Sequence, residues 1–204
     1  MQFIDLKSQQ ARIREDIEAR ISRVLDHGQY ILGPEIKEME EMLASYVGVK
    51  HCVGASSGTD TLLIAFLALG IGPGDEVITV PYTWISTAEM IALVGAKPVF
   101  VDIENDYFCL DVNKVAERIT DKTRAIIAVN LFGHPAQLIE LRRLADSKGI
   151  YLIEDNAQAP LAHENGSQTG TIGHIGVASL NYHKHIHTGE GGVCTTNDDN
   201  LAQD

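Results

Sequence analysis

Short apolar runs rich in β-branched residues alternate with helical segments from residue 51 to residue 196, and this alternation limits the possible folds most. Strands that are separated by helices pair in parallel, because each helix carries the chain back across a face of the sheet. The runs are almost continuously apolar, which indicates strands covered on both faces. The sequence therefore predicts an α/β fold: a mostly parallel seven-stranded sheet with helices on both faces. The expected strands are 51–55, 76–80, 98–102, 125–130, 150–154, 177–181 and 192–196.

Four helices are expected between these strands. Their apolar spacing and their end signals, such as Asp111 before one helix and Gly149 after another, set the bounds. The expected helices are 59–69, 86–94, 111–119 and 136–148.

Two further helices are expected ahead of the sheet. Isoleucines and leucines recur at helical spacing over 8–27, and Gly28 ends the pattern. A second helix begins at Gly33-Pro34, with proline in its first turn. We therefore expect an N-terminal helical segment, 1–32, that packs on the main domain or on a partner chain, and a main domain, 33–204.

The composition argues against several classes of partner. The formal net charge is −12, whereas binding to nucleic acid or to anionic membranes needs clustered Lys and Arg. The N-terminus lacks a signal-peptide pattern, and the longest apolar stretch, 62–71, is shorter than the roughly 20 residues that span a bilayer. Cys52, Cys109 and Cys194 are odd in number and widely spaced, so neither a disulfide framework nor a zinc site is expected. We expect a cytoplasmic protein without nucleic-acid or membrane partners.

Two candidate ligand-binding features follow the first two strands, at the sheet edge where ligands bind in open α/β folds. The small residues of 56–60 let the backbone approach a ligand, and the helix that follows offers free N–H groups to an anion. The alternative is an ordinary helix cap by Ser57 or Thr59. Trp84, the only tryptophan, could stack on a planar ring, or serve as a core or interface aromatic.

A carboxylate follows the fifth expected strand. Asp155 comes directly after the apolar run 150–153. In a desolvated crevice it needs a cationic or hydrogen-bonding partner, such as a protonated heterocyclic nitrogen. Gln158 is close enough in sequence to reach the same ligand. The alternative is that Asp155 caps the next helix.

A lysine among histidines follows the sixth expected strand. Ser179 lies in this strand, Lys184 follows it, and glycines at 189, 191 and 192 return the chain to the last strand. The histidines at 183, 185 and 187 alternate as metal ligands can, but no acidic or cysteine partner stands nearby, so no metal site is expected.

Together these features form the set of groups that pyridoxal 5′-phosphate (PLP) needs. An anion cradle would hold the phosphate, a buried carboxylate would keep the pyridine nitrogen protonated, and a lysine would form a Schiff base and move the proton. The sequence contains no GxGxxG or GxxxxGK[ST] motif that would indicate another nucleotide or dinucleotide site.

Eight segments, in order, resemble the DegT/DnrJ/EryC1/StrS sugar-aminotransferase family: FIDLKSQ, GQYILGPEIKEME, SSGTDTLL, PGDEVITVPYTWISTAEMI, KPVFVDI, NLFGHPA, LIEDNAQA, and SLNYHK with TGEGGVCTTND. The resemblance implies the large domain of a PLP-dependent transferase of the aspartate-aminotransferase fold type. It implies that Lys184 carries the Schiff base, that Asp155 pairs with the pyridine nitrogen, and that Gln158 contacts the phenolic oxygen. It also implies ring stacking by Trp84, and a phosphate site made by Gly58, Thr59, the backbone N–H of Asp60, and Ser179.

The implied activity is transfer of an amino group from glutamate or glutamine to a keto group of a nucleotide-linked sugar, in a homodimer with the active site at its interface. Related dehydratases carry histidine in place of the lysine, and the S-x-x-x-x-K spacing from Ser179 puts Lys184 at that position, which favours an aminotransferase. Family members continue past residue 204 into a small C-terminal domain, which is expected to be absent here. Two alternatives stay open: a truncated remnant that binds PLP without turnover, and a sugar dehydratase.

Overall fold

The computed structural model of the chain describes residues 5–203. The chain forms two compact units, one up to Met39 and one from Glu40 onward, and the division falls inside helix α3 (Pro34–Val47). Within the described residues, no helix is both long enough and apolar enough to cross a membrane.

The N-terminal unit holds α1 (Leu6–Ala11), α2 (Arg14–His27) and the start of α3. The single helix expected over 8–27 is wrong, because Ile13 adopts φ −125° and ψ 10°, outside the helical region, and separates α1 from α2. The predicted end at Gly28 is confirmed: this residue is left-handed, as a helix C-cap favours. Arg23 of α2 pairs with Glu35 of α3 at 2.8 Å.

All seven expected strands are present in one sheet, with ends that shift by at most two residues. The sheet order is β1-β9-β8-β5-β4-β2-β3. The strands are β1 (His51–Ala55), β2 (Glu76–Thr79), β3 (Lys97–Phe100), β4 (Thr123–Val129), β5 (Tyr151–Asp155), β8 (Ile175–Ser179) and β9 (Gly192–Thr196).

One strand departs from the parallel pattern. β9 runs antiparallel to both β1 and β8, whereas β2, β3, β4, β5 and β8 pair in parallel. The connection from β8 to β9 contains no helix, so the chain turns back and pairs with the strand that it has just left. The expectation of a mostly parallel sheet is confirmed, and this strand is its exception.

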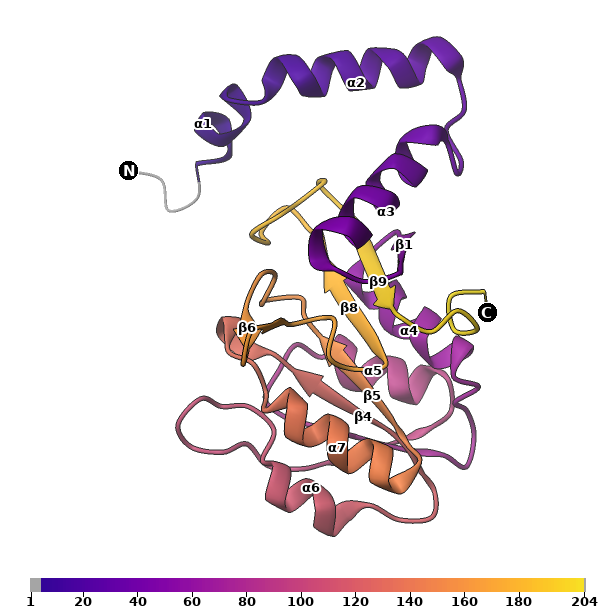
Figure 1. Ribbon diagram of the computed structural model, residues 1–204, viewed down its shortest axis with the longest axis vertical. Coiled ribbons are helices and arrows are strands. Elements are labelled where there is room, and N and C mark those ends of the chain that lie inside the picture. Colours follow the sequence, from indigo (N-terminus) through magenta and orange to yellow (C-terminus); the bar gives the residue numbers. More distant parts are fainter. Residues whose placement is uncertain (1–4, 204) are drawn as a thin grey trace. The chain divides into compact units, whose positions relative to one another are not determined.

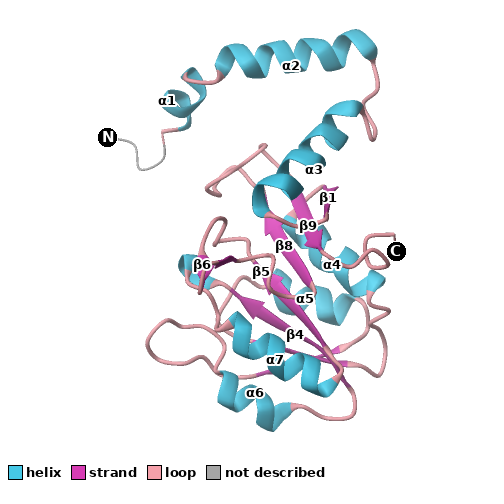
Figure 2. Cartoon of the chain, viewed as in Figure 1, coloured by secondary structure: helices cyan, strands magenta, loops and turns pink. Residues whose placement is uncertain are grey.

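Helices cover both faces of the sheet, as expected. α4 (Gly58–Ala68) packs on β8 and β9, and α5 (Ser86–Leu93) packs on α4, β2 and β3. α7 (Leu138–Lys148) covers β4 and β5 from the other face, with α6 (Val112–Arg118) beside it (Figures 1 and 2). The predicted cap at Asp111 and the end at Gly149 are both confirmed.

A short hairpin that the sequence reading missed connects β5 to β8. It consists of β6 (His163–Glu164) and β7 (Ser167–Gln168), which pair antiparallel. Asn165 and Gly166 form its turn at φ 49° and 84°. An Asn-Gly pair favours this kind of tight turn, so the signal was present, but each strand is only two residues long.

Glu154 fixes the segment that follows this hairpin. Its side chain is fully buried in β5, and its carboxylate oxygens accept the backbone N–H groups of Gly170 (2.6 Å), Ile172 (2.7 Å) and Gly173 (2.5 Å). Burial raises the pKa of Glu154, while the three N–H donors act in the opposite direction by stabilising the ionised form.

We expect Glu154→Gln to lower the free energy of unfolding by about 2–3 kcal/mol, because an amide NH₂ would then face a backbone N–H that has lost its acceptor. Urea denaturation of the chain measures this change. The control is Glu117→Gln on the exposed face of α6, where we expect a change of at most about 0.5 kcal/mol. Equal effects of the two substitutions would contradict a fixing role for Glu154.

Candidate active site

A cavity of about 630 Å³ lies at the sheet edge where β4, β5 and β8 end, beside the N-termini of α4 and α5. Its volume falls within the range of about 300–1,000 Å³ that small-molecule and cofactor sites occupy. All but one of the residues expected at the cofactor site line it: Gly58, Thr59, Trp84, Asp155, Gln158, Ser179 and Lys184.

The first turn of α4 forms one wall of the cavity. Ser57 caps the helix in an extended conformation (φ −159°, ψ 165°), and its Oγ accepts the N–H of Asp60 at 3.1 Å. The amides of Gly58 and Thr59 therefore remain as the N–H groups of this turn that can meet an anion. The alternative interpretation of Ser57, a helix cap, is confirmed, and it is compatible with an anion site.

Two glycines allow this turn to lie close to the sheet. A Cβ on Gly58 would come within 2.7 Å of the Ser179 Cβ, and a Cβ on Gly192 would come within 2.3 Å of the Ser57 carbonyl oxygen. Real Cβ atoms do not approach so closely. Glycine at position 58 therefore allows Ser179 to lie against the helix N-terminus, and glycine at position 192 allows β9 to lie against Ser57.

Asp60 is not among the lining residues in the described part of the chain. Its carboxylate accepts hydrogen bonds from the hydroxyls of Ser56 and Ser57, which lower its pKa. Its backbone N–H, which the family resemblance assigned to the phosphate, is bonded to Ser57 Oγ. Asp60 thus stabilises the turn that presents the two neighbouring amides.

Asp155 is the last residue of β5 and is 8% exposed. The N–H of Ala157 donates to its Oδ1 at 3.2 Å, and the hydroxyl of Thr87 donates to its Oδ2 at 2.9 Å. Burial is the largest effect and raises the pKa of Asp155, while these two donors and the charge of Lys184 act to lower it. The cavity thus contains a desolvated carboxylate under the influence of a lysine charge.

Lys184 lies in the loop between β8 and β9. Backbone bonds fold this loop on itself: Lys184 N–H donates to Asn181 O, and Tyr182 N–H donates to Gly189 O, both at 2.8 Å. The lysine is half-buried, whereas His183 and His185, which also line the cavity, are exposed. Within residues 5–203, no group of three or more His, Cys, Asp or Glu is arranged to hold a metal ion.

Gln158 has an amide whose orientation follows from one contact. The backbone N–H of Phe132 donates to Gln158 Oε1 at 2.9 Å. The oxygen is fixed by this donor, so the NH₂ group is the end that can donate to a ligand oxygen in the cavity. Phe132 itself has a left-handed backbone, φ 54°, which is uncommon for a non-glycine residue and recurs at functional sites.

Two exposed aromatic side chains line the cavity. Trp84 is 74% exposed and Phe132 is 68% exposed, and both line the cavity. Tyr82 lies beside Phe132, with ring centroids 6.5 Å apart. Trp84 is therefore no core residue in this chain, and its expected stacking on a cofactor ring stays a prediction.

The sequence reading missed several residues of this cavity, among them Ser86, Thr87, Phe132 and Glu190. Ser86 and Thr87 begin α5 two residues after Trp84, so a Ser-Thr pair at a helix start close to a candidate residue was an available signal. Nothing local in the sequence marks Phe132.

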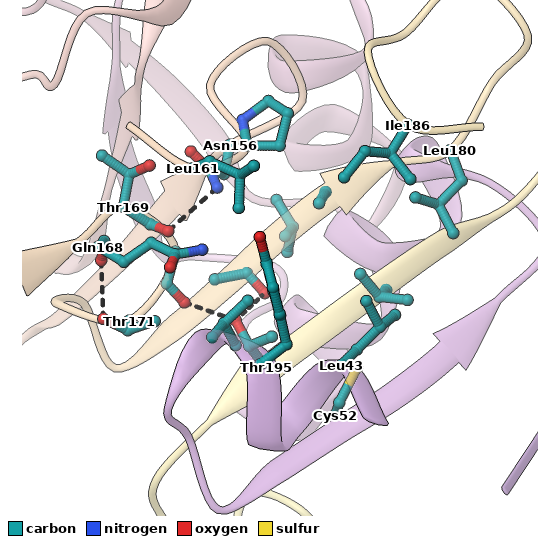
Figure 3. Close-up of a pocket in the computed structure, with 18 of the residues that line it drawn as sticks. Leu43, Cys52, Asn156, Leu161, Gln168, Thr169, Thr171, Leu180, Ile186 and Thr195 are labelled. Atoms are coloured by element: carbon teal, nitrogen blue, oxygen red, sulfur yellow. Dashed lines mark hydrogen bonds between the residues drawn. The ribbon is translucent and has the colours of Figure 1, made fainter. Parts of the chain in front are cut away.

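A second, smaller cavity of about 80 Å³ lies against another part of β8 and β9 (Figure 3). Its wall is mostly apolar and includes Leu43, Leu180 and Ile186. Several of its polar side chains are already bonded to backbone; Asn156 Nδ2, for example, donates to Thr169 O at 3.2 Å. None of the described residues that line it is an Asp, Glu, Lys or Arg, whereas Asp155, Lys184 and Glu190 line the larger cavity.

The family model and two curated relatives that this chain matches are described as aminotransferases or transaminases. The model of the DegT/DnrJ/EryC1/StrS aminotransferase family matches residues 11–204. The chain is 47% identical to the UDP-2-acetamido-2-deoxy-3-oxo-D-glucuronate aminotransferase of Pseudomonas aeruginosa, over 99% of this chain and 56% of that protein. It is 41% identical to the dTDP-3-amino-3,4,6-trideoxy-alpha-D-glucose transaminase of Streptomyces venezuelae, over 98% of this chain and 53% of that protein. The chain spans about half the length of the curated relatives it matches.

Solved structures agree with the fold. A DegT DnrJ EryC1 StrS aminotransferase from Brucella abortus superposes with a TM-score of 0.93 at 40% identity, over all of this chain and 57% of that one. The GDP-4-keto-6-deoxy-D-mannose-3-dehydratase of E. coli, solved with bound hydrated PLP, has a TM-score of 0.84 at 33% identity, over 90% of this chain and 49% of that one.

Proposed function

The chain belongs to the DegT/DnrJ/EryC1/StrS aminotransferase family, and we propose on this basis that its larger cavity binds PLP for amino transfer to a keto group of a nucleotide-linked sugar. One observation carries the proposal. Lys184 and Asp155 line the same cavity, and the lysine charge acts on the buried carboxylate. A cofactor with an aldehyde and a protonated ring nitrogen would use both groups at once.

The residues fit this cofactor. Gly58 and Thr59 present N–H groups at the N-terminus of α4, and Ser179 is held beside them, which suits a phosphate. Gln158 has its NH₂ group available for the ring's phenolic oxygen, and Trp84 stands at the opening where it can cover the ring.

When bound, PLP supplies an electron sink that stabilises a carbanion at the carbon bearing the amino group. Lys184 would hold the cofactor covalently through Nζ and then move a proton at that carbon. Asp155 would stabilise the proton on the ring nitrogen by its charge. Trp84 and Phe132 would limit water at the opening.

The relatives suggest the substrates. Two are named for UDP-linked and dTDP-linked sugars, so a nucleotide-linked keto sugar is the proposed acceptor, and glutamate or glutamine is the proposed donor. Two exposed aromatic side chains line the cavity, Trp84 and Phe132, and the exposed Tyr82 lies beside Phe132. This exposed apolar rim supports a homodimer in which a second copy covers the opening.

A dehydratase is the weaker alternative, because the half-buried lysine and not an adjacent exposed histidine is placed to act on Asp155. The test is to add PLP to the chain, record its absorbance, and then add glutamate or glutamine. Conversion of the bound cofactor to its amine form supports amino transfer. Binding without conversion would identify a cofactor-binding remnant, and no binding would refute the proposal.

The phosphate site gives a prediction of its own. We expect Gly58→Ala to weaken PLP binding about tenfold or more, because the added methyl group would collide with Ser179, and overpacking of this kind costs about 1–3 kcal/mol. The control is Gly72→Ala, where the nearest atom to the new methyl is Val94 O at 3.7 Å. Titration of each variant with PLP measures the dissociation constants, and equal values for the two would contradict the assigned cradle.

A further inference from the structure

Thr87 makes a buried contact with the candidate ring partner from a distant part of the chain. It lies in the first turn of α5 and is 1% exposed. Its hydroxyl donates to Asp155 Oδ2 at 2.9 Å, across 68 positions of sequence. The other oxygen, Oδ1, accepts the N–H of Ala157. Each carboxylate oxygen thus has one donor, and the two donors come from different elements.

The position of the Thr87 hydroxyl is fixed by its surroundings. A β-branched side chain has few allowed χ1 rotamers in a helix, and α5 is packed against α4 and the sheet. The preceding residue, Ser86, accepts a hydrogen bond from the Thr59 hydroxyl at 3.1 Å. Two consecutive side chains of α5 therefore hold two walls of one cavity, the phosphate turn and the carboxylate.

The contact also favours one charge state of Asp155. Burial raises the pKa of this carboxyl group, and the hydroxyl donor opposes that effect because it stabilises the ionised form. A neutral carboxylic acid would give a protonated ring nitrogen no opposite charge. A carboxylate whose two oxygens are each held by one donor keeps its remaining lone pairs for such a partner.

We propose that Thr87 is a positioning residue, which holds the carboxylate of Asp155 in the orientation that faces the protonated ring nitrogen of PLP. This inference rests on the proposed function of the cavity. Thr87 does not touch the reacting carbon, and its effect is exerted through Asp155. If Thr87 acts on the ring nitrogen, its loss weakens binding of PLP but not of an analogue without that nitrogen. If Thr87 serves only packing, its loss affects both ligands equally.

The experiment compares two ligands, PLP and its 1-deaza analogue, in which carbon replaces the ring nitrogen. Dissociation constants are measured by titration for the unaltered chain, for Thr87→Val and for Thr87→Ser. We expect Thr87→Val to weaken PLP binding about tenfold or more, as loss of a hydrogen bond to a charged group predicts, and to change deaza-analogue binding less than about threefold. Thr87→Ser retains the hydroxyl and is expected to restore PLP binding to within about threefold of the unaltered chain.

Equal losses for both ligands, or no loss for PLP, would overturn the positioning role. A Thr87→Ser variant as weak as Thr87→Val would overturn it too. If Thr87→Val does not fold, Thr87→Ala removes the same hydroxyl and takes its place in the comparison. Failure of the unaltered chain to bind PLP refutes the proposed function instead, so the two failures are distinguishable.

Discussion

Lys184→Ala is expected to abolish covalent attachment of PLP and to reduce amino transfer by at least about a thousandfold, since it removes both the nucleophile and the proton-transfer group. The structure gives the reason for choosing this lysine. Its side chain is half-buried at the cavity, and its charge acts on Asp155. Absorbance spectra with PLP and single-turnover assays with an amino donor measure the two losses.

The histidines beside Lys184 provide matched controls. His183 and His185 line the same cavity but are exposed. We expect His183→Ala and His185→Ala to retain the covalent band, with changes in amino transfer below about tenfold. A Lys184→Ala variant that keeps the covalent band would contradict the assignment, and an unaltered chain that binds PLP without a covalent band would favour the dehydratase interpretation.

Asp155→Asn is expected to have the second-largest effect, and opposite effects on the free and the PLP-bound protein. Asparagine keeps the shape of the side chain and removes the buried charge. Because burial raises the pKa of Asp155, ionisation of this group is costly in the free protein. We therefore expect the thermal midpoint without PLP to stay equal or rise, and amino transfer to fall by about a hundredfold or more.

The same variant should lose most of the stabilisation that PLP confers. The free energy by which a ligand stabilises the folded state increases with the logarithm of its affinity, and the affinity for PLP falls when the ring nitrogen loses its counter-charge. Thermal midpoints with and without PLP, for both proteins, give the result. A lower midpoint without PLP, combined with an unchanged PLP-induced rise, would show that Asp155 serves the fold and not the cofactor.

Much of the fold was predictable because the sheet is buried on both faces. Apolar strands and helix end signals are local features, and they located all seven strands and helices such as α6, with its cap at Asp111. Two features of the fold that were not predicted each depend on only a few residues. The break at Ile13 interrupts a regular apolar pattern, and the β6–β7 hairpin is too short to show a strand period.

The candidate site was predictable to the extent that its residues stand at strand ends. Asp155 and Ser179 are the last residues of β5 and β8, so the topology alone brings them to one edge. Asp60 turns its carboxylate toward two serines, a choice among local hydrogen bonds that sequence does not decide. Thr87 matters through a contact with a residue 68 positions away, which only the folded chain reveals.

The central claim is that Lys184 holds PLP in the larger cavity, and one measurement tests it most directly. The chain is incubated with PLP, reduced with borohydride to fix any imine bond, digested, and its peptides are analysed by mass spectrometry. The claim predicts one modified peptide, with the reduced cofactor on Lys184, and no modification there in Lys184→Ala. Labelling spread over exposed lysines such as Lys50, or no labelling at all, would contradict it.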